Sequence, residues 1–206
     1  MGLTLESMAI EMPAVFGHPN RVAFRGVLTT VDAASDKAPA GARGHRVMLT
    51  RSAAEAAIPS LLGMGLDYSP RLDGHDTRRK IGVITRAEIV GREIEVGGFL
   101  YGRDFPEMVE EIGKSDSSGR SGADKSVRAT QEHAGGGARA TQAGLGMSYE
   151  IADAVVEDIK AAVWVLNRVT FTGAAVLRRE KAAYKSTWIE LVESRARLDQ
   201  STNNSD

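Results

Sequence analysis

The sequence predicts a mainly β protein of the α+β class, and three features of the 206-residue chain indicate this. The middle of the chain alternates short runs of β-branched and aromatic residues with turn residues. One predicted strand, residues 163–177, is long enough to be central. Helical patterns are confined to short runs at 52–62, 105–112 and part of 178–192. A hydrophobic content of 42% is sufficient to bury one core.

The first elements follow from local patterns. Hydrophobic and polar residues nearly alternate over residues 21–31, which predicts a strand. A loop rich in Ala, Gly, Asp and Pro separates it from a short strand at 46–50. Ser52 can cap the helix over 52–62, because Glu55 stands three residues later and completes a capping box. Pro59 predicts that this helix stops early or kinks.

The middle of the chain is predicted to form short strands with tight turns. Gly91-Arg92 is expected at a hairpin tip, and Gly97-Gly98 at a bulge. Asp104 can cap the helix over 105–112. The strands expected here and later are 66–68, 81–85, 88–90, 94–96, 99–101, 147–151 and 163–177.

The chain is expected to contain one domain, over residues 21–192, with an arm at 1–20 and a disordered polar tail at 193–206. Residues 113–144 differ from the rest of that domain. Val127 is their single large aliphatic side chain, among glycines, serines, alanines and charged residues. Such a segment buries too little surface to offset its ordering entropy, so we expect a mobile loop there.

Composition excludes several functional classes. The absence of cysteine removes disulfides and thiolate chemistry, and the four histidines are not close neighbours in sequence, so we expect no metal and no cofactor. The net charge of −1 comes without a basic cluster, which argues against nucleic acid as a partner. No apolar run approaches the length that crosses a bilayer, so we expect no membrane segment and no signal peptide.

His75 and Ser148 are the residues that could carry chemistry. A serine hydrolase needs a hydroxyl nucleophile and a base within hydrogen-bond reach. His75 precedes Asp76 in a polar loop, and Ser148 follows Gly144 and Gly146 at the start of a strand. The surroundings of Ser148 lack the Gly-x-Ser-x-Gly elbow of α/β-hydrolases. From these residues alone, a solvated loop histidine and an ordinary strand serine are the usual interpretation, and the dyad is the alternative.

The order of elements resembles the prohead (capsid maturation) protease family of tailed phages, which is related to the herpesvirus assemblins. The resemblance covers about residues 21–187, and it lies in the order and spacing of several short motifs rather than in any single one. The motifs are the strand and helix of 46–62, His75-Asp76 leading to Ile81-Gly82, Gly98-Phe-Leu-Tyr101 before a short helix, Gly146-Met-Ser148, and Phe171–Leu177 followed by Lys181-Ala-Ala-Tyr184.

The resemblance implies a compact β-barrel flanked by short helices, with His75 as general base and Ser148 as nucleophile. Its third catalytic member would lie on the strand after the serine strand, where the family has a histidine or an acidic residue. Here that strand offers Thr170, with Thr172 as the alternative. If neither threonine orients the base, the enzyme would be a Ser–His dyad, or it would recruit another group such as Glu150. The pair Arg178 and Arg179 stands where the family's oxyanion arginines would fall.

The resemblance further implies a serine endopeptidase that cleaves scaffold and major capsid protein segments during head maturation, with self-cleavage. It would act inside the assembling procapsid, in the host cytoplasm, and it would be a possible homo-oligomer. One alternative is a non-catalytic capsid assembly or scaffolding module on the same fold. Another is an unrelated β-rich binding domain in which His75 and Ser148 never meet.

Overall fold

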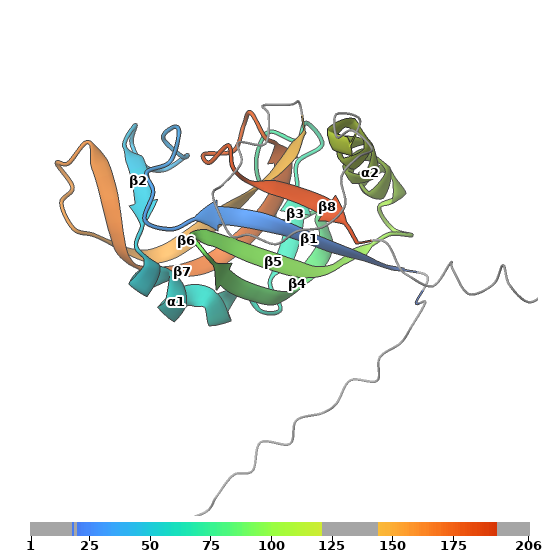
Figure 1. The fold of residues 1–206 in the computed structure, drawn as a ribbon, viewed down its shortest axis with the longest axis horizontal. Coiled ribbons are helices and arrows are strands. Elements are labelled where there is room, and N and C mark those ends of the chain that lie inside the picture. The colour runs from blue at the N-terminus through green and yellow to red at the C-terminus, as the bar shows by residue number, and fades with distance from the viewer. Residues whose placement is uncertain (1–17, 19, 121–143, 193–206) are drawn as a thin grey trace, which may run out of the picture.

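The structure is a computed structural model, and it describes residues 18, 20–120 and 144–192. It is mainly β: one mixed sheet curls into part of a barrel, and two helices lie beside it (Figure 1). The strands are β1 Arg21–Thr30, β2 Arg46–Leu49, β3 Gly65–Tyr68, β4 Lys80–Val90, β5 Glu93–Tyr101, β6 Leu145–Val156, β7 Val163–Arg178 and β8 Trp188–Leu191. The helices are α1 Arg51–Ala57, continued by a 3₁₀ turn over Ile58–Leu61, and α2 Pro106–Arg120.

The sheet is organised around β7, its longest strand. β6 pairs antiparallel along one edge of β7. Two short strands share the other edge of β7, and both are parallel to it. β2 pairs with β7 residues 163–166, and β3 pairs with β7 residues 174–176. The order then continues through β4, β5 and β1 to β8, so the eight strands occupy seven positions.

The open side of the curl is closed by side chains. The Met147 N–H of β6 donates to Thr187 Oγ1 just before β8, at 3.2 Å. The Leu145 N–H donates to Ser115 Oγ of α2, at 3.0 Å. A Cβ on Gly26 of β1 would lie 2.8 Å from Met147 Sδ, so a glycine is what lets β1 and β6 approach. The two ends of the sheet therefore meet through hydroxyl groups and through the Met147 side chain packed on Gly26.

The core fills the inside of the curl, because alternate residues of each strand point inward. α1 packs against β7, and α2 lies beside β8 (Figure 1). The largest fully buried side chains include Phe24, Leu28, Leu66, Ile84, Leu100, Ile112 and Phe171.

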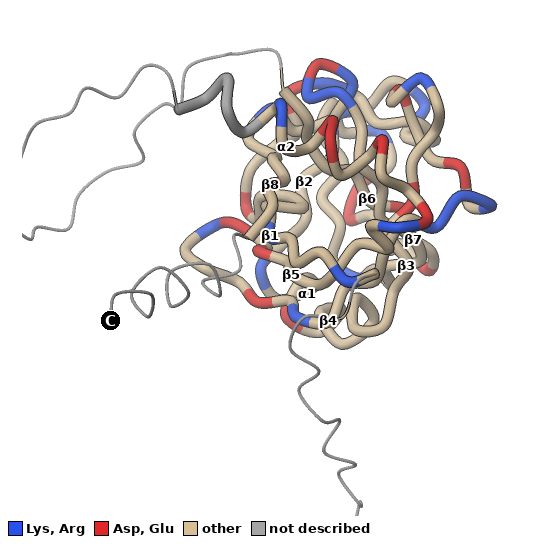
Figure 2. Tube along the Cα trace, turned by 90° about the vertical axis from the view of Figure 1, so that its right-hand side faces the viewer, with Lys and Arg blue, Asp and Glu red and all other residues tan. Residues whose placement is uncertain are grey.

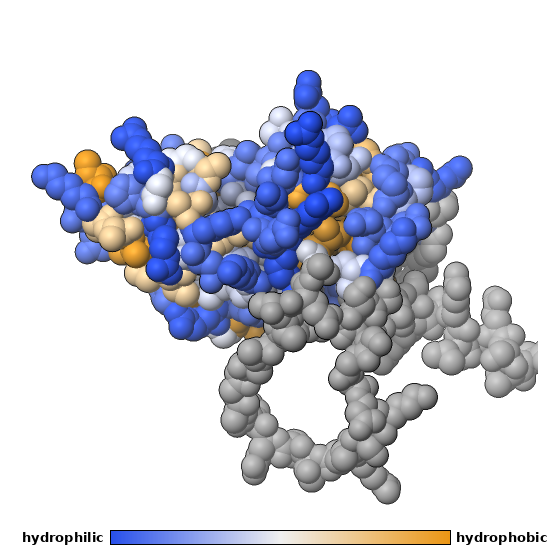
Figure 3. All heavy atoms as spheres, turned by 90° about the horizontal axis from the view of Figure 1, so that it is seen from above, coloured by the Kyte–Doolittle hydropathy of each residue, from blue (hydrophilic) through white to orange (hydrophobic). Residues whose placement is uncertain are grey.

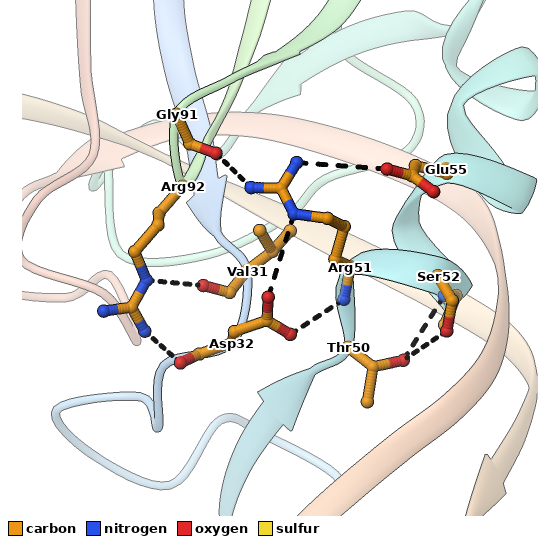
Figure 4. Close-up of polar contacts among 9 residues, drawn as sticks. Val31, Asp32, Thr50, Arg51, Ser52, Glu55, Gly91 and Arg92 are labelled. Carbon is orange, nitrogen blue, oxygen red and sulfur yellow. Dashed lines mark hydrogen bonds and ion pairs between the residues drawn. The ribbon is translucent and has the colours of Figure 1, made fainter.

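A polar junction ties the β4–β5 hairpin to the start of α1 (Figure 4). Asp32 follows β1 with a φ of 51°, and its carboxylate accepts the Arg51 N–H at 2.9 Å. The Arg51 guanidinium donates to the Gly91 carbonyl at the hairpin tip. Arg92 donates to the carbonyls of Val31 and Asp32. Both arginines thus satisfy backbone carbonyls that would otherwise lack partners at this end of the sheet.

Most expected strands are confirmed, with three differences. The strands expected at 81–85 and 88–90 form the single strand β4, and those at 94–96 and 99–101 form β5. The expected hairpin tip is confirmed, whereas the register irregularity opposite Gly97-Gly98 falls on β4, between Ile84 and Arg86. The partial helix expected at 178–192 is wrong: turns lead to β8 there, because this segment completes the sheet beside β1.

The helices also differ in their bounds. Thr50, not Ser52, caps α1, since its Oγ1 accepts the Ala53 N–H at 3.3 Å. The early stop at Pro59 is confirmed by the 3₁₀ turn. α2 runs to Arg120, eight residues into the loop expected at 113–144. Met108 and Ile112 are buried and anchor its first half on the core, and in the part that local composition does not predict, Ser115 Oγ accepts the Leu145 N–H. The expected loop residues 121–143, the arm at 1–17 and the tail at 193–206 lie outside the described residues.

Replacing Gly98 by Ala should destabilise the fold far more than replacing its neighbour Gly97. A Cβ at Gly98 would lie 2.0 Å from the Val83 carbonyl oxygen, whereas one at Gly97 would make an ordinary 3.5 Å contact with the Phe24 carbonyl oxygen. We expect Gly98→Ala to lower the free energy of unfolding by about 1–3 kcal/mol, the usual cost of overpacking. Urea unfolding of both variants tests this, and equal losses would contradict it.

Candidate active site

Four side-by-side residues on neighbouring strands form the floor of the candidate site. Ser148 of β6 pairs with Ala175 of β7, Ala175 pairs with Asp67 of β3, and Asp67 pairs with Lys80 of β4. Residues opposite one another on adjacent strands share a face of the sheet. Ser148, Asp67 and Lys80 therefore lie on one face, with the small Ala175 between the serine and the aspartate.

His75 reaches this face from the loop that joins β3 to β4. The loop is held in place by its own contacts. Leu72 is buried, and its carbonyl accepts the Arg178 N–H at 2.8 Å. Ser69 Oγ donates to Asp73 Oδ1 at 2.7 Å. These contacts fix the path of the backbone into His75.

The His75 ring lies between two carboxylates. Its Nδ1 is 3.4 Å from Asp67 Oδ1 and 3.9 Å from Glu150 Oε1, and the side chain is only 16% exposed. Among the described residues, neither ring nitrogen makes a well-formed hydrogen bond. The 3.4 Å contact is thus an electrostatic approach, longer than a good N–H···O bond. The imidazole therefore lies next to carboxylates from two strands, β3 and β6.

Asp67 is the most constrained residue of the site. It is fully buried, and Lys80 Nζ donates to its Oδ2 at 2.9 Å while the Asp76 N–H donates to Oδ1 at 3.3 Å. Burial alone would raise the pKa of Asp67, but the contacts with His75 and Lys80 outweigh it, and the pKa is lowered. The carboxylate therefore stays ionised beside the imidazole.

The ionised Asp67 should make the free energy of unfolding depend on pH in the acid range. Because its pKa is lowered in the folded state, its contribution is present above the ordinary carboxyl value and is lost as the pH falls below roughly 4. Asp67→Asn lacks this contribution at every pH. We therefore expect the variant to be less stable than the wild type at pH 7 and the difference to shrink as the pH falls towards 2. Urea unfolding at several pH values measures it, and a difference that grew in acid would contradict this sign.

Glu150 stands two residues beyond Ser148 on β6, on the same face. Its partner across the ladder is Gly173, where an added Cβ would lie 2.6 Å from Glu150 Oε2. The glutamate side chain thus lies over the bare backbone of β7. This path brings its carboxylate to His75.

The other residues expected at the site lie elsewhere on β7 or directly after it. The Thr170 hydroxyl donates to Asp153 Oδ2 at 3.3 Å, and Thr170 is five residues before Ala175. Thr172 is exposed. Arg178 ends β7 opposite Leu145, and Arg179 Nη2 donates to the Leu145 carbonyl at 3.3 Å. The structure brings His75 to the face that carries Ser148, but no hydrogen bond joins these two residues or either threonine to His75.

Sequence reasoning missed Asp67 and Lys80. A usable signal was present, because Asp67 is a charged residue inside an apolar strand, between Leu66 and Tyr68, eight residues before His75. A buried carboxylate needs a cationic partner, and Lys80 supplies it at the first position of the next strand. The sequence alone does not show that the two strands pair at these positions.

The described surface carries charges of both signs. In the view of Figure 2, basic and acidic residues are interspersed along the chain. The face shown in Figure 3 is mostly hydrophilic, with small, separate hydrophobic areas. Within residues 18, 20–120 and 144–192, no cluster of His, Asp and Glu has the grouping to hold a metal ion. No helix of that part is long and apolar enough to cross a membrane.

Comparisons of the chain with models of protein families, with curated proteins and with solved structures find no match.

Proposed function

We propose that this chain is a serine-type endopeptidase, with Ser148 as nucleophile and His75 as general base. One observation carries the proposal. The loop between β3 and β4 holds His75 against the buried, ionised Asp67, and Asp67 lies on the same face of the sheet and in the same row as Ser148. Titratable side chains enclosed against a specific buried charge partner cluster at functional sites. The serine supplies the nucleophile that such an arrangement serves.

The roles follow from the contacts. With Nδ1–H directed at Asp67, the lone pair of Nε2 is free to take the Ser148 proton as Oγ attacks a scissile carbonyl. His75 then returns that proton to the leaving amine. Asp67 orients the ring and stabilises the imidazolium, while Lys80 and the Asp76 N–H hold Asp67. Hydrogen bonds between base and nucleophile are often long without substrate. We therefore expect His75 and Ser148 to reach hydrogen-bond distance in the complex with substrate.

The oxyanion site is proposed at the end of β7. Arg178 and Arg179 stand three and four residues beyond Ala175, beside the start of β6. The Arg179 guanidinium already contacts the Leu145 carbonyl, three residues before Ser148. A guanidinium in this place could stabilise the developing negative charge on a peptide carbonyl.

The biological setting is proposed on the resemblance to prohead proteases. On this proposal the curled sheet is a barrel of the herpesvirus-protease type. The enzyme cleaves scaffold and major capsid protein inside the assembling procapsid, in the host cytoplasm, cleaves itself, and acts as a homo-oligomer. The mainly β sheet with two flanking helices supports this fold assignment in its coarse form.

A covalent probe separates the enzyme from a non-catalytic assembly module. A fluorophosphonate phosphonylates the serine of a working Ser–His pair, with loss of fluoride. We expect one label per chain, on the peptide containing Ser148, and no label after His75→Gln. The matched control is Ser186→Ala, which removes an exposed hydroxyl that contacts Thr30. Absence of label, together with uncut capsid protein on co-expression, would favour the assembly module.

A further inference from the structure

The acidic residues near His75 differ in whether a Lys or Arg side chain is paired with them. Asp67, from β3, is paired with Lys80 of β4. Asp76, in the loop of His75 itself, is paired with Arg78 and Arg79. Glu150, from β6, has no Lys or Arg partner among the described residues, and its one ion-pair contact there is with His75. Glu150 therefore supplies the uncompensated negative charge at the imidazole.

The place of this carboxylate depends on Gly173. Glu150 is 42% exposed and could extend into solvent, where a carboxylate is well hydrated. Instead it lies across β7, in space that a Cβ at Gly173 would fill: that atom would be 2.6 Å from Oε2 and 3.3 Å from the glutamate Cδ. An alanine at this position would push the carboxylate away from His75.

We propose that Glu150 is a second positioning residue for His75, held there by the absence of a side chain at Gly173. Asp67 is buried and fixes the ring, whereas Glu150 reaches Nδ1 from the solvent side and stabilises the charged imidazolium. For its catalytic consequence the inference rests on the proposed protease function. The contact itself can be tested without activity.

The first test is an NMR titration of the His75 ring, with its signal assigned by His75→Gln. Loss of an anion 3.9 Å from Nδ1 makes the imidazolium less favourable. We expect Glu150→Gln to lower the pH midpoint of this titration by about half a unit to one unit. Glu157→Gln, which removes the carboxylate just after β6, is the matched control and should leave the midpoint unchanged.

A double-mutant cycle tests the role of Gly173. Gly173→Ala should shift the midpoint in the same direction as Glu150→Gln, and the double variant should match Glu150→Gln, because a glutamine has no charge to displace. No shift in Glu150→Gln, or a further shift when Gly173→Ala is added to it, would overturn the proposal. If Gly173→Ala does not fold, Glu150→Gln against Glu157→Gln still decides whether the charge acts on His75.

Kinetics separates this inference from the proposed function. If the chain is a protease, the acid limb of its pH profile for kcat/KM should move with the NMR midpoint in Glu150→Gln, with a loss of about tenfold or less. A midpoint shift in a chain that never cleaves or labels would leave the contact standing and remove the protease. Cleavage by a chain whose midpoint does not move in Glu150→Gln would support the protease and remove the proposed role of Glu150.

Discussion

Replacing Ser148 by Ala should abolish cleavage of co-expressed capsid and scaffold protein while the fold remains intact. Loss of the nucleophile of a working Ser–His pair lowers kcat by a factor of roughly 10⁵ to 10⁶. The same change removes one hydroxyl from a partly buried strand residue, so its effect on the free energy of unfolding should stay below about 1 kcal/mol. Cleavage is followed by the size of the capsid protein, and stability by urea unfolding.

The double variant Ser148→Ala, His75→Gln makes this test specific. Residues that act as a unit give non-additive losses, so the double variant should be no slower than Ser148→Ala alone. Cleavage that continues at the wild-type rate in Ser148→Ala would remove Ser148 from the mechanism. A further large loss in the double variant would mean that His75 acts apart from Ser148.

Replacing Asp67 by Asn should lower kcat by a factor of roughly 10² to 10⁴. The upper figure is the loss seen when a triad carboxylate of a serine protease is made neutral. The lower figure allows for Glu150, which keeps a second carboxylate near Nδ1. Asn preserves the size of the side chain, but its single amide oxygen can accept from either Lys80 Nζ or the Asp76 N–H and not from both, so the loss reports the charge and one acceptor rather than a cavity.

Thr170→Val and Thr172→Val are the controls for Asp67→Asn, since they test the assignment that the sequence favoured. The Thr170 hydroxyl contacts Asp153 in the β6–β7 hairpin, and Thr172 is exposed. We therefore expect both variants to keep turnover within about twofold of the wild type, because a surface hydroxyl away from the base contributes little. A large loss in either, with Asp67→Asn fully active, would restore a threonine as the third member.

Local sequence was sufficient for elements whose patterns are self-contained. The alternating strand β1, the long strand β7 and the Gly91-Arg92 turn were all predicted near their observed places. β8 and the second half of α2 were not, because their stability comes from tertiary contacts. β8 pairs with β1, and Ser115 in the second half of α2 accepts the Leu145 N–H of β6. Propensity is a weak guide where packing decides.

The candidate site was predictable only in part for a related reason. His75 and Ser148 were chosen from the order of motifs, and the structure places His75 on the face that carries Ser148. Asp67 enters the site through the register of β3 against β7 and of β7 against β6, two pairings between distant segments. Because a slip of one residue would turn Asp67 to the other face, the composition of β3 could not assign it.

The arrangement of strands around β7 has a consequence for how the chain folds. β2 and β3 lie more than 100 residues before their partners on β7, and both pair with it in parallel. Contacts between such distant segments close large loops and form slowly. During synthesis the residues up to the end of α2 would emerge without the strand that joins β2, β3 and β6. Asp67 and Ser148 can take their places in one row only after β7 has been made, so the order of synthesis itself delays assembly of the site until Arg178 has been added.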